Sequence, residues 1–477
     1  MQPKCTTPLC FLLLTVCYFK SSAQEQLGLR LDNYAGANAL ILNPAANATH
    51  PLIWDINIMG AGFWVNNNLG YIENANLPKV LKNINNIGPN PSLKLVNKAS
   101  ATLFYNTYTR TSYQVSVGGH IMGPSISVNL RNRHSFGVFT AGRTMLTSHN
   151  LPNLVNSEDF HKINYNQAFQ VDPFKISGLA WSEIGLNYAV KLDSDNDKGV
   201  TIGANVKYMM GFQGFFLTNY NGTVAAQLSK DTFRIDAIRA TIGFTTNYDS
   251  QPLQQNGKGF GFDIGAVLTT EGGDNKPYQW RFGVSLLDLG RLTLQQATEV
   301  HTFNSSETFQ LETMNLDSLN NTDNPRSVIL DKVNEKIAAK TQVGSTFAMG
   351  LPSALQLQAD YAFSDKLFIN GLLIQRFRLT EVALERENLI AVTPRYETRW
   401  LGASMPISVT NMQQLRVGLN ARLAFLTLGT DHLLSWIGNS KLSGTDFYFA
   451  LKLNPFNRRS DEGVGKGSRK KVNCYRF

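Results

Sequence analysis

The feature that most constrains this chain of 477 residues is a two-residue hydrophobic period that recurs along most of its length. The run VTIGANVKYMMG, which starts at Val200, places Val, Ile, Ala, Val, Tyr and Met on one face and mainly Thr, Gly, Asn and Lys on the other. The run EIGLNYAVKL, which starts at Glu183, repeats this alternation, and the polar stretch DSDNDKG lies between the two. Alternating runs joined by a short polar turn predict a β-hairpin.

About 14 such runs can be counted, several of them longer than the usual strand of about five or six residues. The pattern therefore predicts an all-β fold, a single transmembrane antiparallel β-barrel of about 14 strands. Its apolar face is rich in aromatic residues, which suits lipid and the interfacial girdles. Its polar face mixes Gly, Asn and Gln with isolated charges, predicted to face the lumen: Glu183, Lys191, Lys207, Asp263, Asp360, Glu397, Arg399, Arg416, Arg422 and Lys452. A soluble β-sandwich remains the alternative, because alternation does not say whether lipid or a second sheet covers the apolar face.

The first 23 residues predict a signal peptide, because Lys4 precedes an apolar run and the stretch SSA follows it. Processing would leave Cys474 as the only cysteine of the mature chain, which excludes an intrachain disulfide framework. Lipid attachment at Cys17 is the alternative, but Val16 before it is large for that kind of processing.

The formal net charge of +9 does not indicate a nucleic-acid partner. Residues 457–477 carry +5 of it and the leader carries +2, which leaves only +2 on the body of the chain. We expect the basic tail 457–477 to be a disordered periplasmic extension. The alternative is a docking arm for a periplasmic or cell-wall partner.

Motifs for chemistry are missing from the sequence, and we predict neither an enzyme nor a cofactor nor a metal site. The chain has no H-E-x-x-H and no G-x-S-x-G motif, and its seven histidines are scattered. The stretch DSDNDKG starts like a calcium loop, but Lys198 and Ala204 occupy the positions that require Gly and Glu.

Four stretches in this order carry a resemblance: AGANALILNPAANA, EIGLNYAVKL with GVTIGANVKYMMG, GFGFDIGAVL with RFGVSLLDLG, and LTLGTDHLL with GTDFYFALKL. The chain resembles the FadL-like outer-membrane barrels and is most similar to a Bacteroidota outer-membrane family of unknown function. It is more distantly similar to the PorV-like barrels of type IX secretion. The resemblance implies an outer-membrane location, insertion by the barrel-assembly machinery, and transport of hydrophobic molecules.

The resemblance also implies that residues 24–50 form a plug inside the barrel. The composition agrees, because small residues keep such a segment thin and amides supply hydrogen bonds to a polar wall. The predicted plug residues are Asn33, Gly36, Asn38, Asn43, Pro44 and Asn47. A loose lead into the first strand is the alternative reading.

Residues 51–456 are predicted to form the barrel, interrupted by inserts near 73–98, 146–175 and 294–340, the last with a helix from Pro325. Barrels of this kind end on a strand with an alternating aromatic signal that is read during insertion. We assign this insertion signal to Phe447, Phe449, Leu451, Leu453 and Phe456, in preference to the terminal Tyr475 and Phe477.

These features together predict a passive pore or transporter for small hydrophobic or amphipathic molecules, gated by the N-terminal plug. The alternative is a non-transporting scaffold, or a PorV-like component of a secretion machine, whose tail docks a periplasmic partner.

Overall fold

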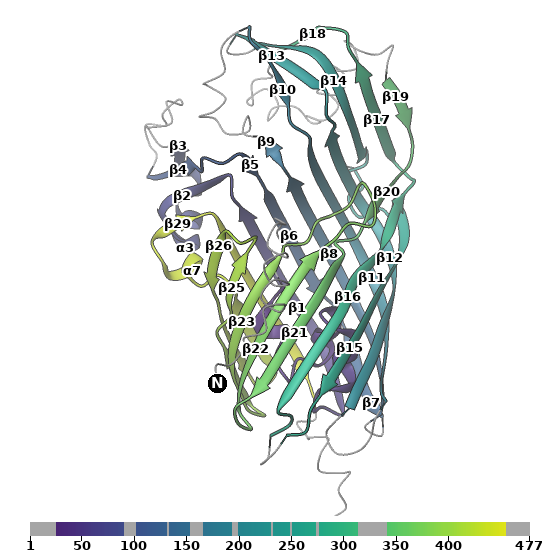
Figure 1. Cartoon of the computed structure of the whole chain (residues 1–477), viewed down its shortest axis with the longest axis vertical. Helices are drawn as coiled ribbons and strands as arrows, with labels where there is room; N and C mark the ends of the chain where they lie inside the picture. Colours follow the sequence, from purple (N-terminus) through teal and green to yellow (C-terminus); the bar gives the residue numbers. More distant parts are fainter. Residues whose placement is uncertain are drawn as a thin grey trace, which may run out of the picture.

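The structure is a computed structural model that describes residues 25–89, 102–130, 133–152, 166–192, 199–229, 232–248, 250–272, 276–312 and 341–454. Within these ranges the chain forms a closed antiparallel β-barrel with 14 strand positions, as the sequence predicts. The ring closes where the first strand pairs with the last, for example at Phe63 and Phe447. Figure 1 shows the barrel from the side.

The wall of the barrel, in chain order, consists of β1 (Trp54–Asn67), β6 (Val115–Met122) with β7 (Ser125–Leu130), β8 (His134–His149), β11 (Phe174–Lys191), β12 (Gly199–Asn219), β14 (Thr232–Thr245) with β15 (Gly257–Thr269), β16 (Trp280–Leu294), β20 (Phe347–Gly350) with β21 (Ala354–Ala362), β22 (Leu367–Arg376), β23 (Leu389–Glu397), β24 (Leu401–Ser404) with β25 (Ile407–Thr410), β26 (Gln414–Val417) with β27 (Leu419–Leu423), β28 (Leu426–Thr430) and β30 (Gly444–Leu453). We call the end of the barrel where Trp54 and Leu453 lie the base, and the opposite end the top.

The alternation of side chains assigns the two faces of the wall. On β11 the inward residues Glu183 and Asn187 are buried, whereas Leu186 is 59% exposed on the outer surface. The hairpin predicted for this region is present, because β11 and β12 pair antiparallel along nearly their whole length. The apolar face of the sequence pattern is therefore the outer face here, as expected for a barrel in lipid.

The wall is much taller on one side than on the other. Strands β8, β11 and β12 have 16, 18 and 21 residues, whereas β22, β23 and β30 have 10, 9 and 10. Shorter strands extend the tall side towards the top (Figure 1): β10 (Ala168–Val171), β13 (Thr223–Ser229), β17 (Thr298–Ser305), β18 (Phe309–Glu312) and β19 (Thr341–Gly344). The short strands match the roughly 9–11 residues that cross a hydrocarbon layer.

The predicted inserts differ from the structure at their edges. The second begins later and ends earlier than predicted, because β8 runs on to His149 and β11 starts at Phe174. The third includes two strands of the tall side, and the helix predicted from Pro325 lies outside the described residues. A hydrophobic period fades where strands leave lipid, which is why these extensions escaped the pattern.

The region of the first insert and residues 434–442 near the end of the chain together form a small unit beside the top of the short wall (Figure 1). This rim unit is a four-stranded sheet with short helices: β2 (Gly70–Ala75), α3 (Leu77–Lys82), η4 (Ile84–Asn86), β3 (Ile87–Pro89), β4 (Leu103–Thr107), α7 (Leu434–Ile437) and β29 (Ser440–Leu442). Nearby, β5 (Ser112–Tyr113) pairs with β9 (Leu151–Pro152). No helix within the described ranges is both long enough and apolar enough to cross a membrane.

Residues 25–50 lie inside the barrel and contact its inner faces; we call them the lumenal segment. The segment folds into three short helices, α2 (Leu27–Arg30) and the 3-10 helices η2 (Gly36–Ile41) and η3 (Pro44–Ala48). The Asn43 side chain caps η3 by accepting from Ala45 N, and Pro44 starts that turn, where a missing N–H costs nothing.

Candidate functional site

The lumenal segment is held by side chains from many strands rather than by a core of its own. Its predicted amides contact different parts of the wall. Asn38 Nδ2 donates to Asn57 Oδ1 over 3.1 Å, and Asn47 Nδ2 donates to Asn187 Oδ1 over 2.6 Å. On the opposite side, Asn33 N donates to Glu397 Oε2 over 3.1 Å. The short helices of the segment bond within themselves, for example Leu31 N to Leu27 O over 3.1 Å, and wall groups satisfy side-chain amides and backbone groups that these bonds leave over.

Backbone groups at the beginning of the lumenal segment reach the last strands of the barrel. Leu27 N donates to Asp431 Oδ2 over 3.0 Å, and Gly28 N donates to the Tyr448 hydroxyl over 3.1 Å. Asn420 Nδ2 donates in turn to the Gly28 carbonyl over 3.1 Å.

Gly36 lies directly against the wall. Its φ is +56°, and a Cβ there would lie 2.1 Å from the Asp55 carboxylate. That carboxylate accepts from Ala37 N over 2.9 Å and pairs with Lys452 over 3.3 Å. Lys452 Nζ also donates to the carbonyls of Tyr34 and Ala35. Only glycine fits both the left-handed conformation and the available space.

Asp32 joins the segment to the wall through a buried ion pair. Its Oδ2 lies 2.8 Å from Arg422 Nε, and the same guanidinium stacks over the Tyr34 ring at 4.7 Å. Burial raises the pKa of the Asp32 carboxyl, but Arg422, together with the Tyr34 backbone N–H and Lys452, outweighs burial and holds that pKa below its usual value. The pair is therefore charged at neutral pH.

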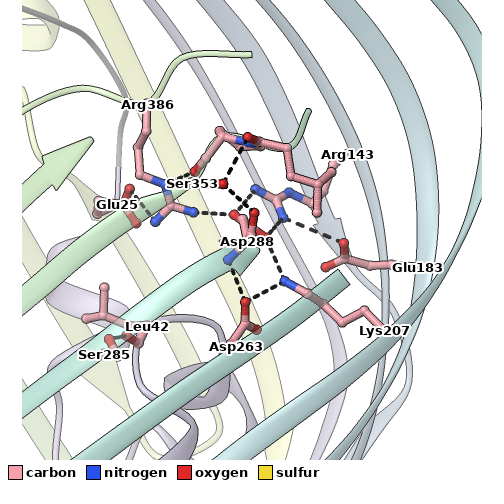
Figure 2. A network of polar contacts seen from close by, with 12 residues as sticks. Glu25, Leu42, Arg143, Glu183, Lys207, Asp263, Ser285, Asp288, Ser353 and Arg386 are labelled. Atoms are coloured by element: carbon pink, nitrogen blue, oxygen red, sulfur yellow. Dashed lines mark hydrogen bonds and ion pairs between the residues drawn. The ribbon is translucent and has the colours of Figure 1, made fainter. Parts of the chain in front are cut away.

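A layer of buried charges lies directly above the lumenal segment (Figure 2). Asp288 is its centre and accepts from three cations: Arg143 at 2.9 Å, Lys207 at 2.6 Å and Arg386 at 2.5 Å. Asp263 accepts from Lys207 at 2.8 Å and from the Asp288 backbone N. We call these residues, together with Glu183 and Glu25, the charge layer.

Glu25 and Arg386 bring together two segments that enter the lumen from different ends. Glu25 belongs to the lumenal segment, whereas Arg386 belongs to the loop 377–388 between β22 and β23 at the top. Arg386 Nη1 lies 3.1 Å from Glu25 Oε1. The loop itself is held against the wall by Leu384 N, which donates to Gly350 O over 3.0 Å.

Above the charge layer the lumen becomes apolar. Trp181 stands at the boundary, because its ring lies 4.8 Å from the Arg143 guanidinium and its Nε1 donates to Glu183 Oε2 over 3.2 Å, while it also packs in a hydrophobic cluster. We call the buried cluster above it the apolar compartment: Met145, Leu179, Trp181, Met209, Phe216, Leu292, Leu294, Phe347, Met349, Leu351 and Leu384. The inner face of β12 passes through all three levels of the lumen from the base upward: Asn205 at the lumenal segment, Lys207 in the charge layer, and Met209 and Phe216 in the apolar compartment.

Eight of the ten predicted lumenal charges are buried on the inner face, each at most 4% exposed: Glu183, Lys207, Asp263, Asp360, Glu397, Arg416, Arg422 and Lys452. Lys191 is only half-buried, at the last position of β11. Arg399 is exposed in the turn after β23, where its guanidinium lies over Trp400. The alternation does not carry Arg399 inward, because β23 already ends at Glu397.

The predicted insertion signal lies on the outer face of β30. Phe447 and Phe449 are half-buried there, and Leu451 and Leu453 are about 40% exposed, at 40% and 41%. Phe456 and the tail 457–477 lie outside the described residues.

Sequence reasoning missed the residue at the centre of the charge layer. Asp288 has a φ of +53° and sits in a β-bulge opposite Asp263, so the two-residue period breaks there. Arg386 was missed because it lies in a loop. Arg395 could have been found, since it shares the inner face of β23 with Glu397 and pairs with Asp360 at 2.8 Å. Within the described ranges, no group of three or more His, Cys, Asp or Glu side chains is arranged to hold a metal ion.

Comparison with solved structures finds barrels with low similarity. A mutant of the monoaromatic hydrocarbon channel TodX is 10% identical, with 88% of this chain and 94% of that chain covered, at a TM-score of 0.41. The toluene transporter TodX of Pseudomonas putida is 10% identical, with 92% and 97% covered, at 0.38. A FadL homologue from Pseudomonas aeruginosa is 8% identical, with 91% and 99% covered, at 0.24. Scores of this size carry no argument about function.

No curated protein sequence matches this chain significantly. A family model does match, over residues 44–431, which is well over half of the chain and includes most of the barrel wall. Its description is a family of unknown function, as the resemblance implies, whereas the Bacteroidota origin and the PorV-like similarity stay predictions. The chain therefore belongs to this family of unknown function, DUF5723.

Proposed function

We propose that this protein is an outer-membrane barrel that transports small hydrophobic or amphipathic molecules, with the lumenal segment as its plug. The leader sequence supports export, and the apolar outer face of the short strands suits a lipid bilayer. The proposed route runs from the top of the barrel through the apolar compartment and past the charge layer.

The observation that carries the proposal is the apolar compartment inside the lumen. A pore for ions or sugars is lined by polar groups, whereas here eleven buried apolar side chains gather above a charge layer. Ligand sites for apolar molecules are concave, mostly hydrophobic and bounded by a few placed polar groups. The Arg143 and Trp181 boundary provides such groups for the polar end of an amphipathic molecule.

Transport requires that the compartment open, since its side chains are at most 8% exposed. Leu384 is the member that the loop 377–388 contributes. Besides Arg386 and the Leu384 backbone, Glu385 holds the loop by pairing with Arg376 and His149, and Gly350 N donates to Val382 O. The lumenal segment is bonded to strands around most of the ring. Because the loop, and not the segment, contributes a side chain to the apolar compartment, we propose that the loop moves first and that the segment is displaced only in a later step.

The test is uptake of a hydrophobic fluorescent probe into vesicles that contain the reconstituted protein. We expect Leu292→Lys to reduce probe uptake strongly, because a charge would occupy the apolar compartment. The matched control is Leu292→Met, which keeps the volume and the apolar character of the side chain at the same position. Deletion of residues 24–50 should raise liposome swelling by small solutes. Equal probe uptake by Leu292→Lys and Leu292→Met would contradict the proposal.

One observation favours the second candidate, a non-transporting scaffold or PorV-like secretion component. The lumenal segment is bonded on all sides, as befits a permanently closed barrel. In that case the tail 457–477 would dock a periplasmic or cell-wall partner. Two results together would favour the scaffold. Deletion of residues 457–477 would remove a partner that co-purifies with the full chain, and vesicles with the full chain would take up no more probe than vesicles without protein.

A further inference from the structure

We propose that the rim unit is a membrane-interface anchor that binds anionic lipid headgroups in the leaflet at the top of the barrel. The inference rests on the proposed membrane location. It concerns a surface outside the lumen, formed by α3, η4 and α7, which plays no part in the proposed transport route.

The helix α7 is continuous with the apolar outer surface of the barrel. The Trp436 ring lies 5.7 Å from the Phe447 ring on the outer face of β30, and Trp436 Nε1 donates to Asp446 O over 2.8 Å. Phe447 is paired across the closure with Phe63, which is 41% exposed on the same outer face. An apolar path therefore runs from the barrel surface directly onto the rim unit.

The rim unit presents large apolar side chains that its own sheet does not cover. Leu81 and Ile84 are both 61% exposed on α3 and η4, and Leu434 and Ile437 are 49% and 70% exposed on α7. The helices α3 and α7 contact each other, so these side chains come from adjacent turns. Apolar groups gathered at one place on a surface mark an interaction site rather than a folding core.

Lysines accompany these apolar side chains. Lys79 and Lys82 lie in the last turn of α3, and Lys441 lies on β29 with its Nζ 4.6 Å from the Tyr71 ring centre. Lys79 Nζ donates to the Asn74 carbonyl, which leaves its remaining N–H groups for a ligand. Apolar side chains beside lysines are typical of elements that lie in the headgroup region of an anionic membrane.

The height of the short wall places the rim unit at the headgroups. The strand β30 has 10 residues from Gly444 to Leu453, about the length that crosses the hydrocarbon. The helix α7 ends at Ile437, seven positions before that strand begins, and its Trp436 contacts Phe447 near the top end of β30, so α7 lies at the upper edge of the hydrocarbon. On the tall side, strands continue through this level and project past it, as Figure 1 shows. Because the two walls differ in height, the rim unit meets the headgroups beside the short wall and not beside the tall one.

The test places a fluorophore on the rim unit and measures its quenching by brominated lipids. The processed protein with Cys474→Ser carries Ile437→Cys or, as the matched control, Tyr220→Cys at the top of the tall wall. Both are refolded into phosphatidylcholine vesicles with brominated phosphatidylcholine or brominated phosphatidylglycerol. We expect strong quenching at position 437 and little at position 220, with phosphatidylglycerol favoured at 437.

The lysines are tested in the same vesicles. In Lys79→Gln/Lys82→Gln, the preference for brominated phosphatidylglycerol at position 437 should fall by about fivefold per lysine removed. The control is Lys366→Gln, which changes an exposed lysine in a turn at the base of the barrel and should leave the preference for brominated phosphatidylglycerol unchanged. Equal quenching at 437 and 220 would overturn the anchor, and an unchanged preference in the double variant would overturn the headgroup assignment.

Heat-modifiable gel mobility separates this inference from the proposed function. A protein that shows the mobility shift in vesicles but no quenching at position 437 refutes the anchor alone. A protein that never shows the shift and stays soluble without detergent refutes the membrane barrel, and with it both proposals.

Discussion

The base and the top of the lumen are filled in two different ways. At the base, a thin segment is bonded to the wall by amides, carboxylates and cations, each of which requires a partner at a fixed place. At the top, an apolar cluster packs beside the buried ion pairs that Glu385 makes with Arg376 and His149. Removing one partner of a buried ion pair costs about 3–5 kcal/mol, whereas apolar clusters tolerate repacking. The contrast teaches that the base depends on partners at fixed places, whereas the apolar part of the top can accept changes of side-chain shape.

The largest expected effect comes from Asp288→Asn, which leaves three buried cations with one anionic centre fewer. We expect the free energy of unfolding to fall by about 3–5 kcal/mol. Urea titration followed by heat-modifiable mobility measures it. The control is Asp236→Asn, whose pair with Arg234 is part-exposed and worth less than about 1 kcal/mol. A similar decrease in the free energy of unfolding in both variants would mean that the charge layer stabilises the fold no more than an exposed ion pair does.

The second prediction concerns Glu387, a buried residue of the loop 377–388. Burial raises the pKa of its carboxyl to about 7, although Arg416 and Asn66 act in the opposite direction. The folded protein thus holds a proton that the unfolded chain loses near its ordinary pKa of 4.5. The unfolding free energy should therefore fall as pH rises from about 4.5 to about 7, by about 3 kcal/mol.

Glu387→Gln should flatten this dependence, because glutamine stays neutral throughout. Urea unfolding at a series of pH values from 4 to 8 would show it. If both proteins lost stability equally over this range, another group would be responsible.

The third prediction is Leu384→Ala, which tests whether the top is the adaptable region. Leu384 is 1% exposed in the apolar compartment, and its truncation leaves a cavity. We expect a loss of about 2 kcal/mol, near the lower end for buried leucines, because the loop can relax. Uptake of the hydrophobic probe should rise in the same variant. A loss of stability without a rise in uptake would separate the loop from the proposed route.

The smallest effect is expected from Gly36→Ala in the lumenal segment. Alanine pays about 1–2 kcal/mol in the left-handed conformation, and its Cβ meets the Asp55 carboxylate. Limited proteolysis should then cleave the segment faster. Gly142→Ala is the control, since a Cβ there meets nothing within 4 Å. If the two variants behaved alike, the segment would not be packed as tightly as described.

Much of the fold could be predicted from the sequence because the signal is periodic. Simple alternation predicts that the outer face of β11 carries Ile184, Leu186 and Tyr188, and all three are exposed. The resemblance to FadL-like barrels implied that residues 24–50 lie inside the barrel, and the small residues and amides of the lumenal segment agree with that position. The apolar compartment could not, because Leu179 and Trp181 lie on the same face as Glu183 and appear as an exception to a polar lumen.

By itself, the sequence determined that apolar and polar residues alternate along the strands, that the strands pair antiparallel, and that the outer face is apolar. A period of two residues follows from the local geometry of a strand alone. Only the tertiary structure decided that Asp288, Lys207 and Arg386 meet, and that the lumen changes from polar to apolar along its axis. Those facts depend on a bulge, a loop and the register between strands distant in the chain. None of these leaves a local pattern.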